Sequence, residues 1–574
     1  MKYDMLIMHP PAIYDFRRAS YFPGPVSEFS IHTTTQQIQV PMGMLSMADY
    51  LDRNGYKVLV DNIGERMMTD RTFEPRSYIA GTSAKIYGIG LHWHVHIQGA
   101  LEIAKMCKTS HPDSLVVLGG LTATRFHSEI IEKFDFVDAV IRGEAEKPLL
   151  EFIRAYESQK RVVATPNVTC REGSGITVSP LMKPSTNLDE FEFTRLSLLE
   201  PKGSIFGLGT PPHLSMFICR GCVYNCVSCG GSAYSYRTYF GMERPSFRSP
   251  KKLIEDVQRL VEQRVRLIGL LQDARMGGRK YWTELLSMLR KEDLDVDRLT
   301  MELFRPADEE YITELANTGK VLALNMSPES GSYEVRRAHG RNYTNGELLN
   351  TVKLCQKHGI PLTLFFMLGL VGENFETIEE TRKLCDKLCT MEQAATTKSF
   401  SEGTKRFVPL SAPIMGHMIF VDPGSRGFDH PEEYGYSLLY KDLEDDIQKI
   451  NAPHWSQRIN FETKKLSKDG YVELVYKTSE FIIDQREKYG LLNPDEIAVE
   501  RFSLKLDRAL NKEVELIGKD EDETSRRTRL RCLKFAFDSF FSNPRTVVDP
   551  YGYGKMMHEI SQETHAPFFR GAGG

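Results

Sequence analysis

Cys219-Arg220-Gly221-Cys222-Val223-Tyr224-Asn225-Cys226-Val227-Ser228-Cys229 holds four of the ten cysteines of this 574-residue chain. So few cysteines in so long a chain do not form a disulfide scaffold, and their local density indicates a metal centre. The CxxxCxxC spacing of Cys222, Cys226 and Cys229 lets one loop place three thiolates around a corner of a cubane iron–sulfur cluster. The fourth iron is then left without a protein ligand and is open to a small molecule.

Zinc is the main alternative to an iron–sulfur cluster at these cysteines. Four thiolates can together bind one zinc ion, but structural zinc usually takes two CxxC pairs separated by a spacer, which this stretch lacks. Cys219 fits three roles: a surplus structural cysteine, which has the better odds, a fourth ligand of a resting cluster, or a catalytic residue. The spacing therefore favours a cluster on the last three cysteines.

The cysteine stretch follows the first strand of a repeated strand–helix pattern. Strands are predicted at 214–218, 267–271, 298–303, 321–326 and 362–367, and helices at 252–263, 281–290, 309–316, 345–358 and 376–387. Repeated βα units predict a full or partial βα barrel, whose chemistry takes place at the carboxyl ends of the strands. The cysteines are therefore expected at the reactive face of this barrel.

The first 155 residues predict a second α/β unit. Apolar runs alternate with helical stretches in the pattern of a doubly wound parallel sheet, with strands at 4–8, 57–61, 86–91, 115–118 and 139–141. Ligands of such sheets bind beyond the carboxyl ends of the strands. Two of those ends carry His92-Trp93-His94 and Gly119-Gly120. A dinucleotide site is not favoured, because GxGxxG is absent after the first strand.

The cysteine motif, placed after the first barrel strand, resembles that of the radical S-adenosylmethionine (SAM) superfamily, over roughly residues 205–400. The resemblance implies a [4Fe–4S] cluster on Cys222, Cys226 and Cys229, which act as metal ligands and catalytic residues. It also implies that SAM chelates the open iron and is cleaved to a 5′-deoxyadenosyl radical.

The same resemblance extends to two later segments. Ser327-Pro328-Glu329-Ser330-Gly331 resembles the segment that contacts the ribose and amino acid of SAM, through Glu329 and Ser330. Leu368-Gly369-Leu370-Val371-Gly372-Glu373 resembles the turn that contacts adenine, through Gly369, Gly372 and Glu373. Strand-end polar residues are further candidates for SAM or substrate, although an acid there is as often a helix cap; they are Gln272, Asp273 and Glu302.

A doubly wound domain ahead of such a barrel resembles the cobalamin-binding architecture of B12-dependent radical SAM enzymes. The resemblance implies that Gly119 and Gly120 let the backbone approach the corrin tail, and that Trp93 and His94 are candidates to face the corrin. The alternative for the latter is a partly buried aromatic loop. The DxHxxG motif that supplies a cobalt ligand in methionine-synthase-like domains is missing, so cobalamin is expected with its base off.

These observations predict an α/β fold in four parts. They are an N-terminal doubly wound, Rossmann-like cobalamin-binding domain (1–155), a linker (156–205), a radical SAM partial (βα)6 barrel (206–400) and a mainly helical C-terminal substrate-binding or lid region (401–574). The expected activity is cobalamin-dependent radical SAM methyl transfer from SAM to an unactivated carbon. Two alternatives stay open: a non-methylating rearrangement or cyclisation of a metabolite, and a non-catalytic iron–sulfur or zinc protein.

The resemblance and the composition also bear on partners. The overall resemblance to archaeal methanogen enzymes that methylate a glutamine α-carbon implies a protein or peptide substrate, the alpha subunit of methyl-coenzyme M reductase, and an electron donor such as ferredoxin or flavodoxin. A net charge of −4 gives no reason to expect a nucleic acid or a membrane. With no secretory signal pattern and no apolar run of about 18 residues, a cytoplasmic protein is expected.

Overall fold

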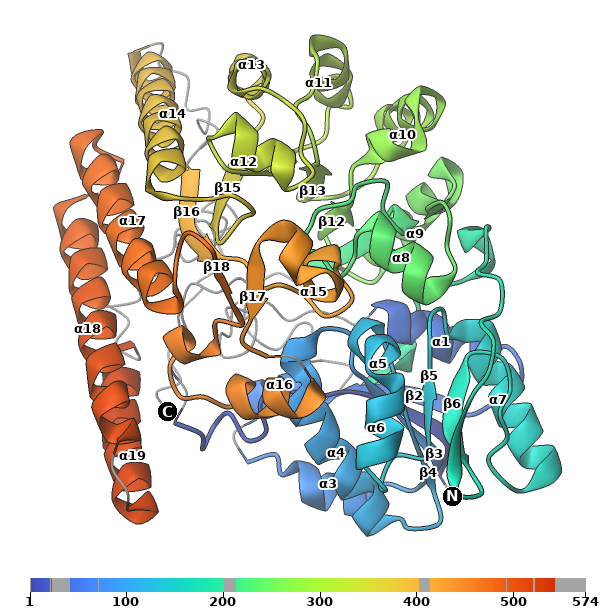
Figure 1. The fold of residues 1–574 in the computed structure, drawn as a ribbon. Helices are drawn as coiled ribbons and strands as arrows, with labels where there is room; N and C mark the ends of the chain where they lie inside the picture. Colours follow the sequence, from blue (N-terminus) through green and yellow to red (C-terminus); the bar gives the residue numbers. More distant parts are fainter. Residues whose placement is uncertain are drawn as a thin grey trace.

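The computed structural model describes residues 2–20, 22, 42–70, 72–200, 213–401, 413–440, 442–491, 493–519 and 522–541. Two mainly parallel sheets, each flanked by helices, organise these residues, and a group of long helices follows them (Figure 1). The expected boundary at residues 205 and 206 and the last part of the C-terminal region lie outside the described residues. No helix among the described residues is long and apolar enough to cross a bilayer.

The N-terminal sheet has eight strands in the order β7-β6-β5-β4-β3-β1-β2-β8. Its first five along the chain are β1 (Tyr3–His9), β2 (Val58–Asn62), β3 (Ala84–Gly90), β4 (Leu115–Gly119) and β5 (Ala139–Ile141), and the pairings among these five are parallel. Helices cross between the strands, as in a doubly wound sheet: α1 (Met42–Asp52), α2 (Ile63–Thr69), α3 (Pro75–Gly81), α4 (Ile97–Ser110), α5 (Leu121–Arg125), α6 (His127–Lys133) and α7 (Glu146–Gln159). Every residue of β2 is buried, as expected of a strand covered on both faces.

The same sheet takes in much of the segment predicted as a linker. β6 (Val168–Glu172) and β7 (Gly175–Val178) pair antiparallel at one edge, and β8 (Leu199–Glu200) pairs with β2 at the other. These strands are short and lie among prolines and glycines, so their sequence carries little period-two signal. The first α/β unit therefore continues to Glu200.

The second sheet has six parallel strands in the order β16-β15-β14-β13-β12-β9. They are β9 (His213–Phe217), β12 (Leu267–Leu271), β13 (Arg298–Leu303), β14 (Leu322–Glu329), β15 (Leu362–Leu368) and β16 (Pro413–Met418). Helices cover one face (Figure 1): α9 (Pro250–Glu262), α10 (Arg279–Lys291), α11 (Glu309–Ala316), α12 (Tyr333–Ala338), α13 (Asn345–His358) and α14 (Phe375–Ser401). Among the described strands, β9 and β16 form the two edges and do not pair with each other, so the barrel is partial. The predicted fold class is confirmed.

The C-terminal region is mainly helical, as predicted. α17 (Lys468–Lys488) packs against β16, α18 (Pro494–Gly518) packs against α17, and α19 (Glu523–Phe541) packs against α18. Figure 1 shows these helices beyond the β16 edge of the barrel. The shorter elements before them are α15 (Arg426–Asp429), β17 (Tyr436–Leu438), α16 (Leu443–Ile450) and β18 (Phe461–Thr463). Because α16 packs against α4, this region also contacts the N-terminal domain.

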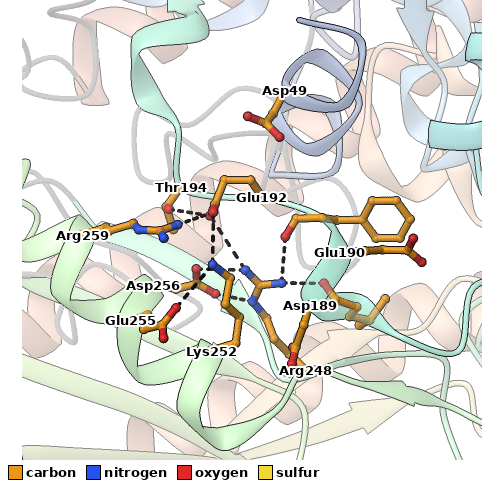
Figure 2. Close-up of polar contacts among 12 residues, drawn as sticks. Asp49, Asp189, Glu190, Glu192, Thr194, Arg248, Lys252, Glu255, Asp256 and Arg259 are labelled. Atoms are coloured by element: carbon orange, nitrogen blue, oxygen red, sulfur yellow. Dashed lines mark hydrogen bonds and ion pairs between the residues drawn. The ribbon is translucent and has the colours of Figure 1, made fainter. Parts of the chain in front are cut away.

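A buried ionic network joins the end of the N-terminal unit to the first barrel helix (Figure 2). The fully buried Arg248 pairs with Asp256 of α9 and donates to the carbonyl oxygens of Leu188 (2.6 Å) and Phe191 (2.9 Å). Burial raises the pKa of Glu192, but the hydrogen bond from Arg259 and nearby positive charges outweigh it and bring this pKa to about 2. The network fixes residues 188–194 against α9.

We expect Arg248→Ala to destabilise the protein strongly, because Asp256 is then left as a buried charge without its partner. Breaking such a pair typically costs about 3–5 kcal/mol. Urea denaturation followed by circular dichroism should show a lower midpoint. Arg266→Ala is the control, since its pairs with Asp295 and Asp297 are exposed and such pairs contribute little. Equal midpoints for the two variants would contradict a structural role for the network.

Candidate functional site

The three predicted cluster cysteines lie on one loop at the carboxyl end of β9. We call residues 221–232 the cluster loop. It begins after β10 (Cys219–Arg220), which pairs with β11 (Ser246–Phe247), and it ends at α8 (Ala233–Phe240). Gly221 has φ +95°, and a Cβ there would lie 2.9 Å from the sulfur of Met242. Only a glycine turns the chain at this point without strain.

The loop presents free thiols with backbone donors aimed at them. Cys222, Cys226 and Cys229 are all free. The Tyr224 N–H donates to Cys222 Sγ (3.4 Å), and the Gly231 N–H donates to Cys229 Sγ (3.3 Å). Hydrogen bonds to sulfur stabilise the thiolate form that metals require. In the described part of the chain, no three His, Cys, Asp or Glu side chains are grouped to hold a single metal ion. This donor set fits a [4Fe–4S] cluster, which spreads three thiolates over three irons.

Arg341 supplies the positive charge beside the cysteines. Burial raises the pKa of the Cys222 and Cys226 thiols, and the guanidinium of Arg341 opposes that effect. Arg341 is held by the carbonyl oxygen of Phe304 (2.6 Å) and lies over the Tyr224 ring, 5.7 Å from its centroid. It lies shortly after α12, outside any strand end, so neither its place in the βα pattern nor its spacing from the cysteines predicted it.

The chain that leads to Arg341 packs directly on the cluster loop. The Val227 N–H donates to the carbonyl oxygen of His339 (3.1 Å). Gly340 has φ +104°, and a Cβ there would lie 2.8 Å from the carbonyl oxygen of Asn225. The segment after β14 therefore contributes both a backbone support and a cation to the cysteine site.

The first predicted SAM segment lies next to this cation. Glu329 ends β14 with φ +68° at an irregularity in the strand pairing, and its Oε1 lies 3.4 Å from Arg341 Nη2. Backbone strain of this kind is found at functional sites. Ser330 is buried, and its hydroxyl contacts Thr381 of α14 (3.2 Å). The buried Arg336 donates to the carbonyl oxygens of Pro328 (3.2 Å), before Glu329, and of Tyr343 (2.9 Å), after α12. Glu329 faces the cysteine site, and Ser330 is held against α14.

The second predicted SAM segment forms a tight turn after β15. Gly369 has φ +93°, and a Cβ there would lie 2.5 Å from the ring of Phe461. The Gly369 N–H donates to Glu373 Oε2 (2.7 Å), and Gly372 also has a positive φ. Burial raises the pKa of Glu373 to about 8. The Glu373 side chain, protonated at neutral pH and accepting a hydrogen bond from the backbone, thus lies at the C-terminal end of β15.

The structure separates the two predicted corrin contacts. Trp93 is 36% exposed beyond the end of β3. His94 is buried and stacks on Phe420, with ring centroids 3.9 Å apart. Gly119 ends β4, and a Cβ on Gly120 (φ +119°) would lie 2.5 Å from the carbonyl oxygen of Leu91. Gly120 is therefore required for the close crossing of two strand-end loops within the protein, whatever it contacts beyond them.

Ion pairs of Arg220 join the start of the cluster loop to the N-terminal domain. Arg220, which precedes the loop, binds both oxygens of the buried Glu146 at the start of α7, one of them at 3.0 Å, and lies 3.5 Å from Glu144. Burial acts to raise the pKa of Glu146, but Arg220 and a hydrogen bond from Ser46 (2.6 Å) bring it below its usual value. The reactive face of the barrel thus lies against the carboxyl ends of the N-terminal strands.

The remaining sequence candidates make structural contacts near the start of the cluster loop or at strand ends. Cys219 is buried, its N–H donates to Gln272 Oε1 (3.3 Å), and burial raises the pKa of its thiol. The Gln272 N–H in turn donates to Glu302. Asp273 accepts from the Arg275 N–H (3.0 Å) and pairs with its guanidinium, so it is a cap, as the alternative interpretation held. These contacts favour the structural role for Cys219.

A doubly wound domain facing a partial (βα)6 barrel that carries three thiols on its first loop has the arrangement expected of a cobalamin-binding domain followed by a radical SAM domain. The family comparisons agree. Residues 216–385 match the model of the radical SAM superfamily, and residues 31–153 match that of the B12 binding domain. The cofactors of these domains are a [4Fe–4S] cluster with SAM and cobalamin, as the sequence analysis predicted.

Individual relatives are distant. An uncharacterized methyltransferase of Pyrococcus horikoshii is 22% identical over 63% of this chain and 77% of its own length. The anaerobic magnesium-protoporphyrin IX monomethyl ester cyclase of Rubrivivax gelatinosus is 24% identical over 60% of this chain, and the match spans only 61% of the cyclase.

Solved structures share the fold across nearly the whole chain. TsrM, a radical SAM methyltransferase from Kitasatospora setae with cobalamin and a [4Fe–4S] cluster bound, aligns with a TM-score of 0.57, at 14% identity over 94% of this chain and 100% of its own. The cobalamin-dependent radical enzyme OxsB, with aqua-cobalamin bound, aligns with a TM-score of 0.56, at 12% identity over 98% of this chain and 80% of its own. At these identities the likeness concerns the fold.

We expect Cys222→Ala, Cys226→Ala and Cys229→Ala each to lose most of the cluster, because two thiolates hold only part of a cubane. Iron content and the visible absorbance of anaerobically reconstituted protein measure this. Cys219→Ala and the exposed Cys532→Ala are controls that should retain wild-type iron. Full iron content in any of the first three variants would contradict the ligand assignment.

The raised pKa of Glu373 predicts a pH-dependent stability. Between about pH 4.5 and 8 the folded protein keeps a proton on Glu373 that the unfolded chain loses. Folding stability then falls as pH rises, by at most about 1.4 kcal/mol per pH unit. Glu373→Gln removes this term, so the variant should gain urea resistance relative to wild type over that window.

Glu376→Gln, at an exposed position in the first turn of α14, is the matched control and should follow wild type at each pH. A constant difference between Glu373→Gln and wild type from pH 5 to 8 would mean that Glu373 is ionised throughout.

Proposed function

We propose that this chain is a cobalamin-dependent radical SAM methyltransferase that transfers the methyl group of SAM to an unactivated carbon of a protein or peptide. The observation that carries the proposal is the position of the three free thiols of the cluster loop, at the barrel face that lies against the carboxyl ends of the N-terminal strands. When bound, the cluster with SAM supplies a radical, and cobalamin carries the methyl group.

The residues of this chain would bind and orient the reactants. Cys222, Cys226 and Cys229 would hold the cluster, and Arg341 would balance the negative charge of the thiolates. Glu329 and the turn at Gly369 to Glu373 would hold SAM at the ends of the neighbouring strands β14 and β15. Trp93, exposed beyond β3, would cover one side of the corrin. Close placement of the reactants is itself a major part of catalysis.

The substrate we propose is a glutamine-containing segment of the methyl-coenzyme M reductase alpha subunit, methylated at the α-carbon. This substrate rests on the overall sequence resemblance. The methyltransferase names of one relative and one structural neighbour support the methyl transfer itself. Ferredoxin or flavodoxin would supply the electron. The second candidate is a rearrangement or cyclisation without methyl transfer, which the name of the cyclase relative favours.

The test is an anaerobic assay with reconstituted cluster, cobalamin, flavodoxin as reductant and SAM carrying a deuterated methyl group. We expect 5′-deoxyadenosine, S-adenosylhomocysteine and a peptide with the labelled methyl group, all detected by mass spectrometry. Cys226→Ala should form none of them, and Cys532→Ala should match wild type.

Two outcomes would contradict the proposal. Formation of 5′-deoxyadenosine without S-adenosylhomocysteine, across peptide and metabolite substrates, would favour the rearrangement. Failure of a fully loaded cluster to cleave SAM would favour the non-catalytic iron–sulfur protein. If labelled methyl groups enter a different peptide, methyl transfer stands and only the reductase substrate is wrong.

A further inference from the structure

One short segment after β16 contacts the cluster loop at three backbone positions. The Asp422 N–H donates to the carbonyl oxygen of Ser228 (3.0 Å), and the Gly427 N–H donates to that of Val227 (2.8 Å). In the reverse direction, the Gly230 N–H donates to Asp422 Oδ2 (2.9 Å). Ser228 and Gly230 flank Cys229, so Asp422 contacts the backbone on both sides of this cysteine.

The fit between this segment and the loop leaves no spare room. A Cβ on Gly230 would lie 3.0 Å from Asp422 Cβ and 3.3 Å from the carbonyl oxygen of Pro423. Asp422 is held in place from behind, because Asn460 binds the backbone of the preceding residue, Val421, at both its N–H (3.2 Å) and its carbonyl oxygen (2.9 Å). The segment is therefore a fixed surface against which the loop packs.

The N-terminal domain packs beside the same carboxylate. His94, on the loop after β3, is buried, stacks on Phe420 at 3.9 Å, and places Nδ1 3.8 Å from Asp422 Oδ1. The two oxygens of Asp422 thus divide: one accepts from the cluster loop, and the other faces the domain that carries the B12-binding fold.

We propose that Asp422 is a positioning residue that sets the conformation of the cluster loop around Cys229, and that His94 of the N-terminal domain helps to fix Asp422 by stacking on Phe420 of the same segment. Asp422 acts through the Gly230 N–H and the loop backbone. The conformation of the cysteine site consequently depends on a contact made by the other domain. The inference rests on the part of the proposed function that places a cluster on this loop, and it does not depend on which reaction follows.

The test uses the full chain, reconstituted anaerobically with iron and sulfide and without cobalamin, SAM or substrate. The readouts are the electron paramagnetic resonance spectrum of the reduced cluster and the rate at which a chelator removes iron. We expect Asp422→Ala to change the spectrum and to speed iron loss several-fold. Asp422→Asn, which keeps an oxygen for the Gly230 N–H, should restore most of the wild-type behaviour.

Two further variants change the residues that Asp422 faces, one in the cluster loop and one in the N-terminal domain. Gly230→Ala should reproduce the effect of Asp422→Ala, because the added Cβ pushes Asp422 away, and it serves also if Asp422→Ala folds poorly. His94→Ala should change the spectrum in the same direction although it lies in the other domain. Asp429→Asn is the matched control. Asp429 follows Asp422 closely in the chain but contacts Arg125, Tyr234 and Tyr239. The cluster spectrum of the Asp429→Asn variant should therefore match that of wild type.

Three results would overturn the proposal. A wild-type spectrum and iron retention in both Asp422→Ala and Gly230→Ala would remove the positioning role. A wild-type spectrum in His94→Ala would remove the contribution of the N-terminal domain. An Asp429→Asn variant that matches Asp422→Ala would assign the effect to the whole segment. Because no SAM or substrate is present, failure of methyl transfer leaves these readouts untouched.

Discussion

Three thiols on one short loop must be held so that each can bind a different iron, and this constraint governs the rest of the structure. The loop has little regular structure of its own. Its conformation comes from the turn at Gly221, from N–H groups aimed at two of the sulfurs, and from chain segments packed on either side. An open iron is useful only if the surrounding protein also binds the cofactor that occupies it.

Much of that support comes from residues far away in the sequence. Arg341 follows α12 and faces Glu329 at the end of β14, while Asp422 follows β16 and contacts the backbone around Cys229. Arg220 connects the base of the loop to Glu146 of the N-terminal domain. Buried pairs of this kind contribute more to a defined arrangement than to net stability. The N-terminal domain and the barrel are therefore in direct contact beside the cysteine loop.

The sequence was sufficient for the architecture because the βα pattern is strongly periodic and the cysteine spacing is specific. β13, α11 and α13 were predicted with their observed bounds. β6, β7 and β8 were assigned to a linker because they are short and irregular. His94 was grouped with Trp93 from its position at a strand end, yet its side chain turns inward against Phe420. Arg341 and Asp422 were missed because only tertiary packing brings them to the cysteines, and no local pattern announces such a contact.

The central claim is that the cysteine loop and the end of the N-terminal sheet face a common site. It is tested most directly by the magnetic coupling between a reduced cluster and cob(II)alamin bound to the same chain, measured by pulsed electron paramagnetic resonance on frozen protein. A dipolar interaction between the two centres, absent when either cofactor is left out, is the result that the structure predicts. Two independent spectra, with both cofactors fully loaded, would show that the centres lie far apart and would contradict it.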